Sequence, residues 1–321
     1  MIGTILDAES PQLVVLNGDL ITGENTHLEN STHYIDQIVQ PMLIRNVPWA
    51  SAYGNHDQDF NISTVDLLAR EHTWPNSLTQ RMVPGDRDVV GITNYYLPIY
   101  PSSGSTDTPS LILWFFDSRS GKISGKTGTE AFREDWVSPT VVDWFTRTRD
   151  TLNAQHGGPI PSLAFFHVPT YSIFAFQQGG VSPTKQPGIN DDIIAHQNQA
   201  PYDGKDVPFM KALAETEGLI ATFSGHDHGD DWCFKWNGQL QGMNISAHGL
   251  VQCFGRHTGY GGYGTWTRGS RQIQVDETTL PDFVAKTWNR LEDRSVVGSV
   301  VLNATFGQDD YPTVPNTSTG N

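Results

Sequence analysis

Cysteine is scarce in this chain, whose 321 residues include only Cys233 and Cys253. Two thiols are too few for a zinc site built from cysteines. They allow a single disulfide if the compartment is oxidising. A small fold held together by several disulfides is excluded, and a chain of this length can bury a large apolar core of its own.

Long apolar runs are also missing. The longest clean run, Leu111–Phe116, has six residues, whereas a membrane-spanning helix needs roughly 20. No basic segment followed by an apolar stretch opens the sequence, so we expect no signal peptide in the sequence as given. We also expect no membrane partner.

Basic residues are few: 20 Lys and Arg stand against 35 Asp and Glu, for a net charge of −15. Such a chain repels polyanions, so we expect no nucleic-acid partner. An acidic balance suits a protein that holds cations, although most acidic proteins are merely soluble.

The sequence carries five Asn-x-Ser/Thr tripeptides, which are acceptor sites for glycosylation in secreted proteins. They begin at Asn30, Asn61, Asn244, Asn303 and Asn316. Chance alone supplies roughly three in a chain of this composition. They therefore favour a secreted or vacuolar glycoprotein only weakly.

Strand-like and helix-like segments alternate along the chain, which is typical of a layered α/β domain. No internal repeat or long linker divides them, so we expect one domain over residues 1–306 and a polar, disordered tail over 307–321. The expected strands are 12–17, 48–53, 111–116, 162–166, 219–223, 272–275 and 296–302. The expected helices are 33–45, 139–152 and 209–217.

Four of the expected apolar strands end in polar residues with metal-binding chemistry. These residues are Asp19, then Asn55 with His56, then His167, and finally His226 with His228. In open α/β sheets, ligands gather at the carboxyl ends of the strands. We therefore expect the four strand ends to converge on one site.

The residue types at this site suit a divalent transition metal, since they offer imidazole and carboxylate but no thiolate. His226 and His228 are two positions apart, so in an extended segment both rings point to the same side. The two oxygens of Asp19 can bridge two cations, and Asn55 adds a neutral amide oxygen. Two such metals would stabilise the attacking and leaving oxygens of a phosphoryl transfer.

The same residues carry a resemblance to a known family. Gly18-Asp19, Gly54-Asn55-His56-Asp57, the single His167 and Gly225-His226-Asp227-His228 resemble, in order and spacing, the motifs of the calcineurin-like metallophosphoesterases. Further similarity to the purple-acid-phosphatase-related branch of plants and fungi lies in Phe223–His228, Cys233, Cys253–Gly264 and Thr287–Glu292. The resemblance spans residues 11 to about 302.

The resemblance implies a four-layer α/β-β/α sandwich and a site for two divalent or trivalent metals (Fe, Zn or Mn). It makes Asp19 the bridging ligand, completes one metal site with Asn55, His167 and His226, and places His228 at the other. It also implies hydrolysis of small phosphate esters, phosphomonoesters first, by a metal-activated water. His56 would then protonate the leaving oxygen, a common role for histidine.

The sequence departs from the family in three places. The family opens with an Asp-x-His motif on an earlier strand, but no histidine precedes Gly18. We therefore expect an N-terminally incomplete sandwich with one complete metal site, and an open edge on strand 12–17. Thr22 occupies the position of the tyrosine that colours purple members, and the Asp-Arg-Gly continuation of calcineurin itself is missing.

Some alternatives remain open from the sequence. A phosphodiesterase or nucleotidase would use the same metal core, and a catalytically impaired protein could bind metal or phosphate without turnover. The glycine-rich run Gly255–Gly264 lacks the Gly-Lys-Ser/Thr ending of a P-loop, but Arg256 and His257 within it are candidates for substrate binding. Asp57 and Asp227 could orient ligand imidazoles or simply face solvent.

Overall fold

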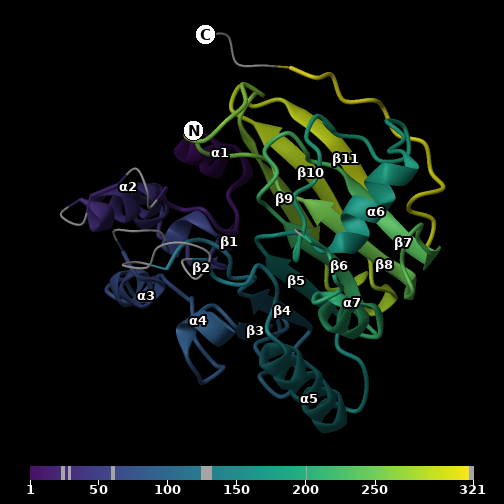
Figure 1. Cartoon of the computed structure of the whole chain (residues 1–321), viewed down its shortest axis with the longest axis horizontal. Helices are drawn as coiled ribbons and strands as arrows, with labels where there is room; N and C mark the ends of the chain where they lie inside the picture. Colours follow the sequence, from purple (N-terminus) through teal and green to yellow (C-terminus); the bar gives the residue numbers. More distant parts are fainter. Residues whose placement is uncertain (23–25, 28–29, 59–61, 124–131, 200, 318–321) are drawn as a thin grey trace.

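The computed structural model describes residues 1–22, 26–27, 30–58, 62–123, 132–199 and 201–317 (Figure 1). Its largest element is a six-stranded sheet with the strand order β3-β4-β5-β6-β8-β7. The four central strands run parallel, and the two edge strands run antiparallel to their neighbours. The bounds are β3 (Tyr95–Ile99), β4 (Leu111–Phe116), β5 (Ser162–Phe166), β6 (Leu219–Ser224), β7 (Cys233–Gln239) and β8 (Ser246–Phe254).

The three apolar strands β4, β5 and β6 are buried along their whole length. Parallel strands covered on both faces read as continuous apolar runs, which is why these three could be expected from the sequence. Three helices cover one face of the sheet (Figure 1): α5 (Pro139–His156), α6 (Tyr171–Gly179) and α7 (Val207–Ala214). Phe145, Ile173 and Phe209 bring these helices into a common core with Trp114 and Phe116 of the sheet.

A second β layer covers the other face, in two parts. One part is the parallel pair β1 (Val14–Leu16) and β2 (Trp49–Ser51). The other is an antiparallel sheet in the order β11-β10-β9, made of β9 (Gly269–Val275), β10 (Ala285–Leu291) and β11 (Val296–Leu302). Among the strands that the structure describes, no ladder of hydrogen bonds joins the two parts, and β1 pairs with β2 alone. This pairing agrees with the open edge expected for strand 12–17.

Helices on the outer side of β1 and β2 form the fourth layer. They are α1 (Ile2–Glu9), α2 (Ser31–Ile44) and α3 (Thr64–Glu71), with the short α4 (Arg87–Val90) further along. Val39 and Met42 of α2 are fully buried against Trp49 of β2. The expected four-layer α/β-β/α sandwich is therefore confirmed.

The two cysteines form a disulfide between facing positions of β7 and β8, Cys233 and Cys253. No helix within the described ranges is both long and apolar enough to cross a membrane. In the expected tail, the Tyr311 N–H donates to the Thr184 carbonyl at 2.8 Å, and the Thr267 N–H donates to the Thr317 carbonyl at 3.0 Å. The boundary proposed at residue 306 stays a prediction, and residues 318–321 lie outside the described part of the chain.

Candidate metal centre

The ends of strands from both β layers meet at one point. Asp19 comes from the turn after β1, whereas His167 and His226 follow β5 and β6 in the six-stranded sheet. One ligand atom from each of these three side chains lies within 4.8 Å of the others. The convergence expected from the sequence is therefore present for these three residues.

His167 is held in one orientation by its Nδ1 atom. Nδ1 lies 2.8 Å from the Asn17 carbonyl oxygen, which can only accept, so Nδ1 carries the proton and donates. Its Nε2 atom is buried and lies 2.9 Å from Asp19 Oδ2, yet it lacks the alignment of a hydrogen bond. A nitrogen and a carboxylate oxygen that lie this close without a hydrogen bond between them are suited to binding the same cation.

The motif glycines allow the backbone to approach these ligands closely. A Cβ on Gly18, whose φ is +90°, would lie 2.3 Å from His167 Nδ1. A Cβ on Gly54 would lie 2.2 Å from Asp19 Oδ1. Any other residue at either position would collide with a ligand side chain. Asp19 and His226 themselves have positive φ values of 53° and 75°, the kind of backbone strain found at functional sites.

Asn55 and His56 enter the site from the turn after β2. The Asn55 Oδ1 atom is buried and has no hydrogen-bond partner, as expected of an oxygen reserved for a cation. The His56 N–H donates to Asp19 Oδ1 at 2.9 Å. The His56 side chain is close enough to act electrostatically on both Asp19 and His226.

Burial and mutual charge shift the pKa values of these groups in different directions. Burial alone would lower the pKa of His167, but the charge of Asp19 outweighs burial and raises it. Burial alone would raise the pKa of Asp19, but the charge of His167 beside it lowers that pKa well below its usual range. Burial, reinforced by repulsion from His167, lowers the pKa of His226 to about 3. Burial likewise lowers the pKa of His228. These shifts keep Asp19 ionised and favour neutral imidazoles at His226 and His228, which are the forms that bind cations without first releasing a proton.

His228 stands apart from the first three ligands. Among the described residues, the group of ligand atoms that lie within 4.8 Å of one another contains Asp19, His167 and His226, but not His228. The His228 ring lies against the ring of His257, tilted by 32° with 3.8 Å between the ring centroids. Asp19, His167 and His226 therefore fit one cation. Asn55 as its fourth ligand, and a second cation at Asp19 and His228, stay predictions.

The two candidates for substrate binding differ in their surroundings. The Arg256 guanidinium is almost fully buried, with NH1 2.6 Å from Asp231 Oδ2 and Nε donating to the Thr267 carbonyl at 2.9 Å. These contacts favour a structural role, so a substrate contact for Arg256 stays a prediction. His257 lies beside His228, and its Nδ1 atom is buried without a hydrogen-bond partner. Burial lowers the pKa of His257 to about 3.

Two supporting residues act through contacts that the sequence does not display. Asp57 accepts hydrogen bonds from the Ile21 N–H (3.1 Å) and the Gly54 N–H (2.8 Å), so it ties together the turns that carry Asp19 and Asn55. Burial, with repulsion from Asp19, raises the pKa of Asp57 to about 7. Asn17 donates from Nδ2 to the carbonyls of Phe166, the last residue of β5, and Phe223, near the end of β6. Its place directly before Gly18-Asp19 was the one signal available.

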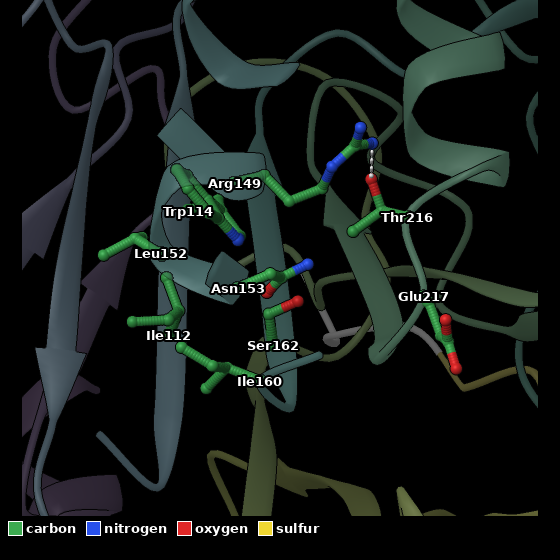
Figure 2. Close-up of a pocket in the computed structure, with 9 residues that line it drawn as sticks. All are labelled: Ile112, Trp114, Arg149, Leu152, Asn153, Ile160, Ser162, Thr216 and Glu217. Carbon is green, nitrogen blue, oxygen red and sulfur yellow. Dashed lines mark hydrogen bonds between the residues drawn. The ribbon is translucent and has the colours of Figure 1, made fainter. Parts of the chain in front are cut away.

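One small pocket of the molecule lies away from these residues. It is a pocket of about 10 Å³ between α5 and strands β4 and β5 (Figure 2), room for about one water molecule. Arg149 NH1 donates to Thr216 Oγ1 at 3.0 Å beside it. None of its lining residues is a metal-ligand candidate, so this pocket is not part of the proposed metal site.

Comparison with known proteins supplies the family. The family model of the calcineurin-like phosphoesterases matches residues 1–230. The chain belongs to this family. It is 29% identical to "Probable inactive purple acid phosphatase 29" of Arabidopsis thaliana, over 93% of this chain and 75% of that protein. It is 27% identical to the phosphatase DCR2 of Saccharomyces cerevisiae, over 89% of this chain and 46% of that protein.

Solved structures support the fold. A dimetal phosphatase from Danio rerio superposes with a TM-score of 0.55 at 14% identity, covering 93% of this chain and 85% of that one. PhoD superposes with a TM-score of 0.53 at 11% identity, over 98% of this chain and 69% of that one. At such low identity the likeness shows the metallophosphatase-type α/β fold alone.

Proposed function

We propose that this calcineurin-like phosphoesterase hydrolyses small phosphomonoesters with the help of bound divalent or trivalent metals. The observation that carries the proposal is the meeting of Asp19, His167 and His226 within 4.8 Å. The unpartnered buried atoms Asn55 Oδ1 and His167 Nε2 at the same site add to it. A satisfied structural network would leave no such atoms, because an unpaired buried polar group costs about 1–3 kcal/mol.

When bound, the cations supply Lewis acidity that activates water and offsets the negative charge of the phosphoryl group. Asp19, Asn55, His167 and His226 would hold the first cation, and Asp19 with His228 the second. Because the first set is complete and the second has two protein ligands, the chain binds close to one tight cation. That cation also offsets part of the net charge of −15, which otherwise disfavours an anionic substrate.

His56 is the proposed proton donor to the leaving oxygen. Its backbone is fixed by the hydrogen bond from its N–H to Asp19 Oδ1, so its position depends directly on the bridging carboxylate. Its ring is not among the three side chains that converge on the cation. A histidine beside a cation, and not bound to it, can keep its proton for the leaving group.

One observation favours a second candidate, a protein that binds metal or phosphate without turnover. The names of three Arabidopsis thaliana relatives include "Probable inactive". Phosphodiester hydrolysis on the same residues is the other alternative. Assays of monoester and diester hydrolysis distinguish these two alternatives from the proposed phosphomonoesterase.

The test compares His56→Ala, Asp19→Asn and a control, His248→Ala, whose side chain is exposed on β8. Hydrolysis of aryl phosphates and of a bis-aryl phosphate is followed with Mn²⁺, Zn²⁺ or Fe²⁺ present, and bound metal is measured after dialysis. His56→Ala should keep the tight cation and lose about 10²–10⁴-fold in kcat, with a smaller loss for acidic leaving groups that depart without a proton. Asp19→Asn should lose both cation and activity, and His248→Ala neither.

Two results would contradict the proposal. If His56→Ala loses metal as readily as Asp19→Asn, His56 is a ligand or a structural residue and not the proton donor. If the unaltered chain binds the cation and inorganic phosphate but turns over neither ester class, the non-catalytic alternative is correct. Faster turnover of the diester would replace the monoesterase assignment.

A further inference from the structure

The glycine-rich loop (residues 255–264), which joins β8 to β9, encloses the imidazole of His228. The ring of Tyr263 lies parallel to one face of that imidazole, at 4.1 Å between centroids and an interplanar angle of 9°. The His257 ring lies 3.8 Å away at 32°. His228 is thus in contact with two rings that belong to one loop.

The same loop sets which nitrogen of His228 carries the proton. Nδ1 lies 3.0 Å from the Tyr263 carbonyl oxygen. A carbonyl oxygen only accepts, so Nδ1 donates its proton to it and the lone pair of the neutral ring stays on Nε2. An outer contact of this kind fixes both the tautomer and the direction of a metal-binding histidine.

Gly262 makes this contact possible. Its φ is +75°, and a Cβ added there would lie 2.4 Å from His228 Cε1 and 3.2 Å from Nδ1. The neighbouring Gly261 faces open space, with nothing within 4 Å of the same added atom. The two adjacent glycines therefore differ in contact with the imidazole and in backbone conformation, because only Gly262 has a positive φ.

The arrangement at His228 repeats the one that holds His167. There the Asn17 carbonyl accepts from Nδ1, and Gly18, at φ +90°, leaves room for the ring. In both cases a backbone carbonyl aims the imidazole, and the glycine beside it, with φ above +70°, gives the ring its space. His167 is a candidate ligand of the first cation, and His228 of the second.

The hydroxyl of Tyr263 fixes the loop against a third segment. It donates to Asp192 Oδ2 at 2.7 Å and lies 3.2 Å from the donating N–H of His228. Asp192 also accepts from the Gly229 N–H at 2.7 Å. The loop is therefore tied to both residues 228 and 229, so its position and that of the imidazole are set together.

We propose that the glycine-rich loop is the positioning element of the second metal site, with Gly262 and Tyr263 orienting His228 and the His257 ring supporting it. This inference rests on the proposed metal-dependent function. It assigns the loop a role distinct from phosphate binding. It also explains how a site with few protein ligands can still present a preset nitrogen.

The first test reads the tautomer without any metal. Histidine labelled with ¹⁵N in the full, cation-free chain reports which ring nitrogen is protonated, and the His228 signals are those lost in His228→Gln. We expect the Nδ1–H tautomer in the unaltered chain and in Gly261→Ala. We expect Gly262→Ala to lose that single tautomer, because the added methyl group displaces the ring.

The second test reads affinity. Zn²⁺ titration against a chromophoric chelator measures the Kd of the first, tightly bound Zn²⁺ and of the second, weakly bound Zn²⁺. Gly262→Ala should raise the Kd of the second Zn²⁺ about 10–100-fold and leave the Kd of the first unchanged. Gly261→Ala should match the unaltered chain in both. If the second Zn²⁺ binds too weakly to titrate, the tautomer of His228 alone tests the proposal.

A third pair of variants covers the case in which Gly262→Ala does not fold. His257→Ala should loosen the His228 tautomer, and His257→Phe, which keeps a flat ring, should restore it. The proposal is overturned if the unaltered chain carries the Nε2–H tautomer, if Gly262→Ala matches Gly261→Ala in both readouts, or if His257→Phe fails to restore what His257→Ala loses. Absence of phosphoester hydrolysis in a chain that passes these tests would refute the proposed function alone.

Discussion

At the scale of single residues, Asp206 is a fully buried carboxyl group. It accepts hydrogen bonds from the Tyr171 N–H at 2.8 Å and from the Tyr202 hydroxyl at 3.1 Å. Burial outweighs these bonds and raises its pKa to about 6. The folded chain therefore holds a proton on Asp206 that the unfolded chain releases near pH 4.

This difference makes stability depend on pH. Because the folded pKa lies above the unfolded value, the contribution of Asp206 is fully present below about pH 4 and is lost as pH rises through about 6. The loss amounts to as much as about 3 kcal/mol. Asp206→Asn should abolish this part of the decline, whereas Asp203→Asn, at an exposed carboxylate in the same turn, should not.

The effect is measured by urea unfolding at pH 4.5 and pH 7.5 of the unaltered chain, Asp206→Asn and Asp203→Asn, each freed of metal with a chelator. A decline between the two pH values that is equally steep in the unaltered chain and in Asp206→Asn would show that Asp206 does not hold its proton in the folded state.

The candidate ligand residues could be picked out one by one because their chemistry is carried by side chains in short motifs. Asp19, His167 and His226 each follow an apolar strand, and the structure brings them together. Asn17 and Tyr263 were not predictable, because both aim an imidazole through a backbone carbonyl. Every residue has such a carbonyl, so residue identity gives no sign of it.

At the scale of elements, the pair β7–β8 is closed by the disulfide between Cys233 and Cys253, which are 20 residues apart. A bond closing a loop of this length stabilises a fold by roughly 3 kcal/mol, mainly by restricting the unfolded chain. The double substitution Cys233→Ala with Cys253→Ala should lower the free energy of unfolding by about that amount.

Urea unfolding under non-reducing conditions is the measurement, and reductant is the control. Reductant should destabilise the unaltered chain to the level of the double variant and leave the variant unchanged. Equal midpoints for all four samples would mean that the bond does not form in solution.

Elements were predictable where one physical signal dominated. The buried parallel strands β4, β5 and β6 are continuous apolar runs, and α2 and α5 have helical spacing. The neighbouring strands β7 and β8 were missed because their exposed halves are polar and contain glycine, including Gly238 and Gly249. What makes them strands is pairing with each other and with β6, a long-range effect that local sequence does not encode.

At the scale of the whole molecule, the metal centre lies across two layers. Asp19, Asn55 and His56 belong to the turns after β1 and β2, and His167 and His226 follow strands of the six-stranded sheet. Backbone pairing does not connect β1 and β2 to that sheet or to β9–β11 among the strands described. Apolar packing joins them, together with side-chain hydrogen bonds such as those from Asn17 to the carbonyls of Phe166 and Phe223. A cation held by Asp19 and the two histidines would add to these contacts.

Removing the cation should therefore loosen β1 and β2 more than the six-stranded sheet. At a free cation concentration of about 100 times Kd, binding contributes about 2.7 kcal/mol, or about 100-fold in an opening equilibrium. Hydrogen exchange of the amides in β1 and β2 should speed up by that order on chelation. Amides of β4 and β5 should change little, and a uniform change in both layers would contradict this expectation.

The division of the second β layer has a consequence for the life of the protein in a cell. Proteases cleave chains that open locally, at a rate set by how often they open. If one cation fastens β1, β2 and their helices to the rest, scarcity of that metal exposes this part first while the large sheet stays intact. The amount of protein would then follow the supply of its metal, and the same ligands would govern both its chemistry and its persistence.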